Sequence, residues 1–376
     1  MVLAAPELVE PEAVEMRCEV DVALELQHRV FTRGMVRCKE GAEAEAGHRA
    51  IVRRDENVAR TGPLVRDARP MPSTDERIVL RPATETDVDA LAAVQSAQDI
   101  AWWGAPDGGV DELRAAIDRV RVGGGNLRDA SRVAVHSTPA GEVVAGFAML
   151  FGHGQSNIAV DPACGVGDLV TERLATWLLD VGATDFEAPG HDTNRRAVFD
   201  RLGLAASRSS FELERLPTID DLGSAVWPDG IAPAAFRHGV DDAEIHALVY
   251  SVWTDVPGHT HRPIDEWRAL FLRDVAEHPE LVIVARFDRG LGAAAGVALS
   301  RTFAGEVGWV SQLAVGRPAR GVGLGRSLLV EAFHRLARLD VGVLGLSVEA
   351  DNAAALGLYR SVGLVVTREW VHHTQR

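Results

Sequence analysis

Lysine is almost absent from this 376-residue sequence, because Lys39 is the only lysine among 39 basic residues. The chain is acidic overall: 54 Asp and Glu against 39 Lys and Arg give a net charge of −15. Such a chain lacks the basic face that nucleic acids and anionic lipids require, so we expect neither a nucleic-acid partner nor a membrane partner. A cationic or amine-bearing small molecule is favoured instead.

Cysteines are few and long apolar runs are missing. Cys18, Cys38 and Cys164 are odd in number and form no Cys-x-x-Cys pair, so we expect neither a disulfide framework nor a metal site. The longest apolar run, residues 291–299, is too short to cross a bilayer, and no secretory signal is visible at the N-terminus. These absences predict a cytoplasmic protein.

The first 70 residues differ from the rest of the chain. They carry scattered Arg, Glu and Ala without a sustained helical or strand period. We expect residues 1–70 to be a disordered or loosely attached N-terminal extension. A cleaner pattern opens at Met71 and continues into the strand-like run at 78–81.

From Arg77 onward the sequence repeats itself at a distance of about 156 residues. Each copy has two helices, two strands, a further strand that leads to a proline and a glycine turn, and a short closing helix. The repeat predicts an α/β (α+β) fold of two tandem domains, each with a mixed, mostly antiparallel central sheet flanked by helices. We expect the domains at 71–216 and 234–376, joined by a proline-rich linker at 217–233.

The most informative motif is the glycine turn of the second copy, residues 320–325, which reads Arg-Gly-Val-Gly-Leu-Gly between a strand and a helix. Glycines let a turn direct several backbone N–H groups at one point, and the following helix adds the positive end of its dipole. This combination is typical of a phosphate cradle, although an isolated glycine pattern more often marks a plain turn between a strand and a helix. A Walker A loop is excluded because no Lys is present, and the glycine spacing differs from that of a dinucleotide fingerprint.

Two motifs together resemble the GNAT superfamily of acetyl-CoA-dependent N-acetyltransferases. The first is Arg320-x-x-Gly323-x-Gly325, similar to the pyrophosphate motif of that family. The second lies at 352–364 and is similar to the family's Asn-x-x-Ala-x-x-Leu-Tyr-x-x-x-Gly-Phe pattern, with Leu364 in place of Phe. The tandem arrangement over 77–376 most resembles the mycothiol synthases and their relatives.

The resemblance implies a role for each matching residue. The fourth strand of the family splays from the fifth, and the pantetheine arm of acetyl-CoA lies in the gap. Tyr359 would protonate the departing thiolate, although the same residue also fits a core aromatic, and only Tyr250 accompanies it in the chain. The residues implied to bind acetyl-CoA are Leu313, Ala314, Val315, Arg320, Gly321, Val322, Gly323, Leu324, Gly325, Arg326 and Asn352.

The reaction also requires that the acceptor ammonium lose a proton, which calls for a general base. Three carboxylates are candidates, namely Glu306, Asp255 and Glu349, and Glu306 is the leading one. We expect Trp253, Asp255 and His259 to line the acceptor pocket. The run His259-Thr260-His261 has no third ligand in place and does not predict a metal site.

The first copy departs from the motif where the chemistry requires it. Cys164 stands at the Arg position, Leu169 at the last Gly position and Phe199 at the Tyr position. Asp168 would place a carboxylate inside the cradle and repel a pyrophosphate. We therefore expect the first domain to be catalytically silent and structural, or to form part of the acceptor cleft, and the second domain to carry the reaction.

The sequence thus predicts an N-acetyltransferase that transfers acetyl from acetyl-CoA to a primary amine of a small molecule. The alternatives are a mycothiol synthase proper, which acetylates a cysteinyl amine, and a non-catalytic protein that binds or senses acyl-CoA. An intact cradle together with Tyr359 favours an enzyme. We expect a monomer or a homodimer.

Overall fold

The computed structural model describes residues 77–376, except 123, 254–260, 273–274, 276–277, 288–291 and 304–305. The expected N-terminal extension at 1–70 lies outside the described residues, and so do Asp255 and His259. The side chain of Trp253 is likewise not described.

The secondary structure confirms that the chain is a duplication, because both halves have the same order of main elements. In each half, the opening strand is followed by two helices, three strands, a helix, a strand, a helix and a last strand. The first half comprises β1 (Ile78–Arg81), α2 (Val88–Trp103), α3 (Val110–Val122), the short α4 (Leu127–Ala130), β2 (Ser131–Thr138), β3 (Gly141–Leu150), β4 (Ser156–Val160), α5 (Gly167–Asp180), β5 (Phe186–Pro189), α6 (Thr193–Arg201) and β6 (Leu204–Arg215). The second half comprises β7 (Ile231–Ala235), α7 (Asp242–Trp253), α8 (Ile264–Phe271), β8 (Val282–Phe287), β9 (Ala294–Phe303), β10 (Val307–Val315), α9 (Leu324–Ala337), β11 (Val343–Glu349), α10 (Ala353–Arg360) and β12 (Val365–Gln375).

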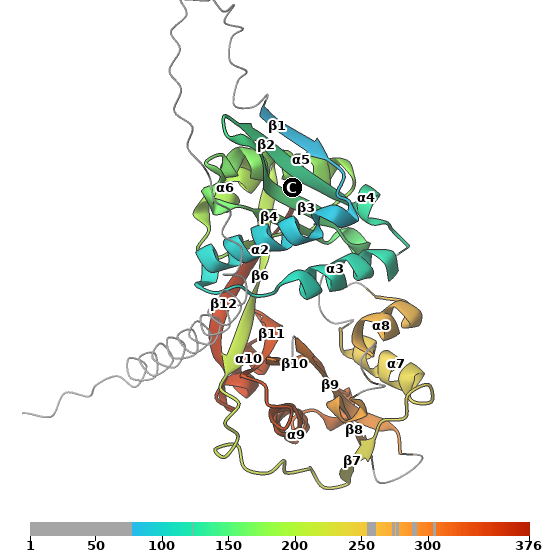
Figure 1. The fold of residues 1–376 in the computed structure, drawn as a ribbon. Coiled ribbons are helices and arrows are strands. Elements are labelled where there is room, and N and C mark those ends of the chain that lie inside the picture. The colour runs from blue at the N-terminus through green and yellow to red at the C-terminus, as the bar shows by residue number, and fades with distance from the viewer. Residues whose placement is uncertain are drawn as a thin grey trace, which may run out of the picture.

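The two halves exchange their last strands. One sheet has the order β1-β2-β3-β4, and the other has the order β5-β12-β6-β11-β10-β9-β8-β7. Strand β6 of the first half therefore lies between β11 and β12 of the second, and Figure 1 shows β6 and β12 side by side at the centre of the molecule. The pairing of β6 with β12 is antiparallel and extends from Leu204↔Gln375 to Glu214↔Val365.

This exchange differs from the arrangement expected from the sequence, in which the chain divides near residue 216 into domains with separate sheets. Each half has a single strand after its last helix, so that strand has no hairpin partner of its own and pairs with its counterpart from the other half. Strand β5 of the first half in turn pairs with the free edge of β12. Strand β7 begins at Ile231, inside the segment expected as a linker, and pairs with β8.

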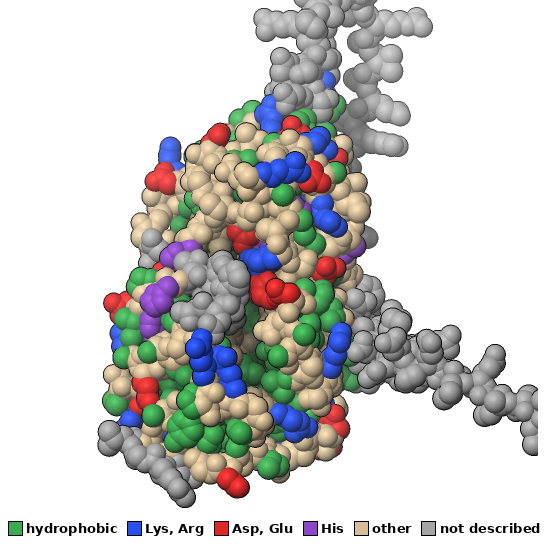
Figure 2. Space-filling model, turned by 180° about the vertical axis from the view of Figure 1, so that it is seen from behind, with side chains coloured by type: hydrophobic (Ala, Val, Ile, Leu, Met, Phe, Trp, Pro, Cys, Tyr) green, Lys and Arg blue, Asp and Glu red, His purple; other side chains and the backbone are tan. Residues whose placement is uncertain are grey.

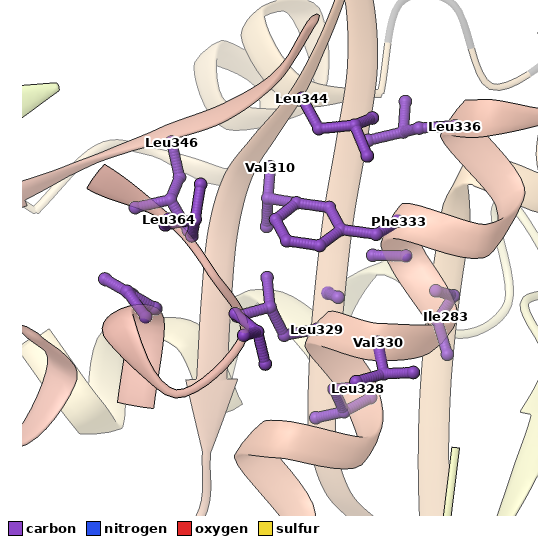
Figure 3. Packing of buried hydrophobic residues seen from close by; sticks show 14 of the residues in the cluster. Ile283, Val310, Leu328, Leu329, Val330, Phe333, Leu336, Leu344, Leu346 and Leu364 are labelled. Atoms are coloured by element: carbon purple, nitrogen blue, oxygen red, sulfur yellow. The ribbon is translucent and has the colours of Figure 1, made fainter. Parts of the chain in front are cut away.

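Helices cover both faces of the second half's sheet. On one face, Leu329, Phe333 and Leu336 of α9 pack against Val310 and Leu344, as Figure 3 shows. These α9 residues recur every three or four positions, which is why the sequence forms an amphipathic helix there. On the other face, α7 and α8 bury the Trp267 ring with residues of β9 and β10.

The first half repeats these layers. Leu174 of α5 packs in one cluster with Ala148, while Leu91 of α2 and Ile117 of α3 pack in another with Phe147. Ala148 and Phe147 are neighbours on β3, and successive strand residues point to opposite faces, so the two clusters lie on the two sides of the sheet. Within the part of the chain that is described, no helix combines the length and the apolarity that a membrane span needs.

The strand exchange predicts that neither half folds alone. If fragments 71–216 and 217–376 are produced separately, the second lacks β6, and the peptide groups of both β11 and β12 lose their partners. We expect each fragment alone to aggregate or to show no cooperative thermal transition, and co-expression to restore a soluble complex with one transition. A cooperative transition of fragment 217–376 alone, measured by circular dichroism, would show that the exchange is dispensable.

Candidate functional site

The parallel strands β10 and β11 separate halfway along their length. They are paired from Val307↔Val343 to Val310↔Leu346, and beyond this point β10 continues to Val315 beside β9 only. A bulge interrupts the β10–β9 register between Val310 and Gln312, where the separation begins. The result is a gap between β10 and β11 that opens toward the C-terminal ends of both strands.

Two residues of β10 direct their peptide groups into this gap. Gly316 N donates a hydrogen bond to Ala295 O, so the peptide groups of every second residue of β10, counted back from Gly316, point toward β9. The peptide groups of Leu313 and Val315, which lie in between, point away from β9 and into the gap. Arg320 Nε donates to Val315 O at 3.2 Å. No described side chain makes a hydrogen bond to Leu313, so its N–H and C=O remain available at the edge of the gap.

The first half has a corresponding gap between β4 and β5, which are linked by one isolated bridge, Gln155↔Asp185. Here the peptide groups are already occupied. Val160 N donates to Gln98 Oε1 at 2.9 Å, and Arg195 Nη1 donates to Ile158 O at 2.9 Å. Arg195 Nη2 also donates to Gln98 Oε1 at 2.6 Å, so the two side chains close the gap together.

Arg195 is buried, and burial lowers its pKa to about 10. It stands on α6 three residues after Asp192, whose carboxylate caps that helix. In the second half, Asn352 caps α10 in the same way, through a 3.1 Å hydrogen bond from Ala355 N to its Oδ1. Ala355 is therefore the counterpart of Arg195, and its methyl group cannot fill the second gap as a guanidinium fills the first.

The glycine turn lies directly beyond the end of β10. Gly321 and Gly323 adopt φ values of 77° and 92°, a left-handed conformation that side chains other than glycine rarely tolerate. Gly323 is the N-cap of α9, and no side chain caps the helix. The first bond of α9 runs from Ser327 N to Gly323 O, so the amides of residues 324–326 have no intrahelical acceptor. The turn therefore presents uncapped N–H groups next to the gap.

The corresponding turn of the first half differs in charge and shape. Gly165 has φ 71° and Val166 occupies the N-cap of α5, but Asp168 lies in the first turn of that helix. Leu169, which the sequence aligned with Gly325, is partly buried, and in the structure it is Gly167 that faces Val160 as Gly325 faces Val315. At Gly325 itself, an added Cβ would lie 3.3 Å from Leu358 Cδ2, which leaves little room for a side chain.

The remaining sequence-predicted residues are placed as follows. Tyr359 lies on α10 with 8% of its surface exposed, in the same cluster as α9, and burial raises its pKa to about 12. Phe199, its counterpart, is fully buried. Ala314 faces α7 and α8, Leu324 is buried, and Val322 is exposed.

Glu306 does not join the other candidates. It is an exposed residue in the turn before β10, where its carbonyl accepts hydrogen bonds from the N–H groups of Gly342 and Val343. Glu306 lies four residues before Val310, about 13 Å along the strand from the point where β10 and β11 separate. The glycine turn lies at the opposite end of the strand.

The sequence did not indicate the polar residues at the opening of the second gap. Trp267 Nε1 of α8 donates to Gln312 Oε1 at 2.9 Å, and both residues are buried. Next to Gln312, the buried Ser311 Oγ has no hydrogen-bond partner among the described residues. A bulge cannot be located from hydrophobic periodicity, so the inward direction of both side chains was not predictable.

A cavity of about 310 Å³ lies between the two halves. Its walls come from α2, β4, β5 and α6 of the first half, and Arg262 and Glu266 close it from the second half. His153 Nε2 lies 3.0 Å from Glu266 Oε1, and Arg262 pairs with the same carboxylate. Figure 2 shows a hollow near the middle of the rear face, with charged side chains at its rim and hydrophobic ones below it.

Comparison with known proteins bears on the class of this protein. Residues 244–364 match the model of the acetyltransferase (GNAT) family. The chain is 31% identical over 292 residues to the mycothiol acetyltransferase of Rhodococcus opacus, which covers 73% of this chain and 93% of that protein. It is 32% identical over 235 residues to the mycothiol acetyltransferase of Nocardia farcinica, which covers 58% and 75% respectively.

Solved structures share the fold. A GCN5-related N-acetyltransferase from Sphaerobacter thermophilus superimposes with a TM-score of 0.65 at 24% identity, over 79% of this chain and 95% of that one. A tandem GNAT protein of the clavulanic acid biosynthesis pathway superimposes with a TM-score of 0.55 at 17% identity, over 79% and 98%. The duplicated fold and its open strand gap thus define an acyltransferase. More specifically, the chain belongs to the GNAT acetyltransferase family.

Proposed function

We propose that this protein transfers the acetyl group of acetyl-CoA to a primary amine of a small molecule, and that the second half carries the reaction. One observation supports this proposal above all others. The gap between β10 and β11 is open at Leu313 and ends at an uncapped helix, whereas the gap of the first half is filled by Gln98 and Arg195.

In this proposal the open gap receives acetyl-CoA. The pantetheine arm, which carries amide groups, pairs with the peptide groups of Leu313 and Val315 that point into the gap, as an additional strand would. The pyrophosphate lies on the N–H groups of residues 321–326, where the positive end of the α9 dipole stabilises its charge. Arg320 and Arg326 add positive charge at the same end, and Asn352 helps to shape this end of the gap by fixing the start of α10.

The chemistry follows from this placement. The amine nitrogen forms a bond to the thioester carbon, the carbon–sulfur bond breaks, and the thiolate takes up a proton. Tyr359 is our proposed donor of that proton, and its raised pKa keeps the phenol protonated at any physiological pH. Backbone N–H groups of β10 next to the bulge stabilise the negative charge that develops on the thioester oxygen.

The acceptor is proposed from charge and from the relatives. A chain with a net charge of −15 attracts a cationic amine. Two relatives are named mycothiol acetyltransferase, so we propose a cysteinyl amine as the first acceptor to test. The acceptor pocket proposed from the sequence comprises Trp253, the last residue of α7, together with Asp255 and His259, which lie outside the described residues.

The first test is a screen of amines. The protein is incubated with acetyl-CoA and with S-methylcysteine amide, glucosamine or spermidine, and the release of the CoA thiol is followed. S-methylcysteine amide has no free thiol and therefore leaves the assay undisturbed. We expect turnover above the rate without amine for at least one compound. Equal rates with and without every amine would contradict the proposed acceptor class.

The second test addresses which half binds acetyl-CoA. Gly321→Asp and Gly165→Asp form a matched pair, because both glycines have a left-handed φ and both have open space around an added Cβ. We expect one acetyl-CoA per chain by calorimetric titration. Gly321→Asp should abolish binding, because its carboxylate repels the pyrophosphate, and Gly165→Asp should leave it unchanged. Two sites per chain, or binding that survives Gly321→Asp, would refute the assignment to the second half.

The third test concerns Tyr359. Tyr359→Phe removes one hydroxyl and retains the shape of a buried ring. If this hydroxyl protonates the thiolate, kcat should fall by about 10²-fold or more, while the affinity for acetyl-CoA should stay unchanged. If Tyr359 is only a core aromatic, Tyr359→Phe should keep kcat within about threefold, below the usual effect of a general acid. Tyr359→Ala, measured for its melting temperature, reports the packing contribution in either case.

A further inference from the structure

The exchanged strand β6 brings a carboxylate of the first half next to the acetyl-transfer gap of the second. Val310↔Leu346 is the last parallel pair before β10 and β11 separate, so Ser347 lies where the gap begins. In the β11–β6 register, Ser347 is paired with Glu212. Glu212 is thus one strand spacing from β11, about 5 Å, at the level where the gap begins.

The side chain of Glu212 points to the face from which an acceptor can approach. Its neighbour Leu213 packs in the cluster of α9, and alternate strand residues face opposite sides. Glu212 therefore faces the side of α7 and α8, as does Gln312, which is bonded to Trp267 of α8. One fifth of the Glu212 side chain is exposed, so solvent reaches it.

The surroundings of Glu212 hold more negative than positive charge. Arg368 lies 3.3 Å from Glu212 but only 2.7 Å from Asp107, and Glu214 lies on the same face two residues away. Three carboxylates thus share one guanidinium. Trp370 Nε1 donates a hydrogen bond to Glu212 Oε1 at 2.9 Å and fixes its orientation. Such a cluster attracts a cation and readily takes up a proton.

Burial is the main cause that raises the pKa of Glu212, to about 7. The charge of Arg368 opposes this shift, and the charges of Asp107 and Glu214 add to it. A group with this pKa is well suited to accept protons near neutral pH.

We propose that Glu212 accepts the proton of the acceptor ammonium bound at the gap of the second half, through one intervening water; this inference rests on the proposed function. The ammonium gives one proton to the water while the water gives one to the Glu212 carboxylate. The neutral nitrogen then bonds to the thioester carbon, and the carbon–sulfur bond breaks. Tyr359 protonates the thiolate and regains a proton from the new amide nitrogen, and Glu212 releases its proton to solvent.

Other carboxylates on the same face are less well placed. Glu349, at the end of β11, is held by Arg208 at 2.7 Å, a guanidinium that also pairs with Asp185 at 2.9 Å. Glu214 is paired with Gly345, in the part of the sheet where β10 and β11 are still joined. An added Cβ at Gly345 would lie 2.4 Å from the Trp309 ring, so this ring lies over β11 between Glu214 and β10. Glu212 is the carboxylate at the level where β10 and β11 begin to separate.

The test compares Glu212→Gln with the wild-type chain in the thiol-release assay with acetyl-CoA and S-methylcysteine amide. For the wild type, kcat should fall as the pH drops through about 7, because protonated Glu212 cannot accept a proton. Glu212→Gln should lower kcat at neutral pH by about 10²-fold, and its rate should keep rising with pH without a plateau. The KM for acetyl-CoA should not change, which a general loss of structure would not predict.

Glu214→Gln is the matched control on the same strand and face. This variant should retain kcat within about threefold of the wild type, which is a smaller decrease than the removal of a general base causes. Because the charge of Glu214 raises the pKa of Glu212, this variant should move the acidic limb to lower pH. Glu212→Asp keeps a carboxylate, so its pH profile should keep the acidic limb while kcat is reduced. This variant provides a second test if Glu212→Gln does not fold.

The outcomes separate this inference from the proposed function. If the wild type turns over an amine and Glu212→Gln has the same rate and pH profile, the role of Glu212 is refuted while the acetyltransferase stands. If Glu212→Gln does not fold, and Glu212→Asp has the kcat and the acidic limb of the wild type, the role of Glu212 is refuted as well. If the wild type turns over no amine, the proposed function fails first, and the inference fails with it.

Discussion

The antiparallel pairing of β6 with β12 is the interaction on which the rest of the structure depends. It joins two halves that each end in a single strand, and it places β11 and β5 on the outer edges of the exchanged pair. Because each exchanged strand is hydrogen-bonded on both sides, the central sheet has no exposed edge between the halves. The gap of the second half is held open on one side by a strand that the first half supplies.

In the proposed function, the duplication lets one half keep the reaction site while the other gives it up. The same gap exists in both halves, but an arginine on α6 and a glutamine on α2 occupy the peptide groups of β4 in the first. The counterpart of the arginine in the second half is Ala355, whose methyl group cannot reach the peptide groups of β10 as Arg195 reaches Ile158 O. Arg195 is stable in its buried position because it donates to both Ile158 O and Gln98 Oε1.

The sequence allowed the duplication, the fold class and the glycine turn to be predicted, because each depends on local patterns. Gly321 and Gly323 do adopt the left-handed conformation that the motif suggested. The strand exchange was not predictable, since a single terminal strand reads the same whether it pairs within its own half or across. The filling of the first gap was also missed, because Gln98 and Arg195 are 97 residues apart and read as ordinary helix residues.

The strand exchange also explains why the sequence suggested candidates for the general base only within the second half. Glu306 was favoured because it precedes the splayed strand in the sequence, yet the strand carries it away from the gap. Strand exchange brings Glu212 of the first half next to β11 at the level where the gap begins, and burial together with a shared guanidinium sets its proton affinity. In the proposed function, the first half therefore contributes to the reaction by supplying one strand with the correct register, while Gln98 and Arg195 occupy its own gap.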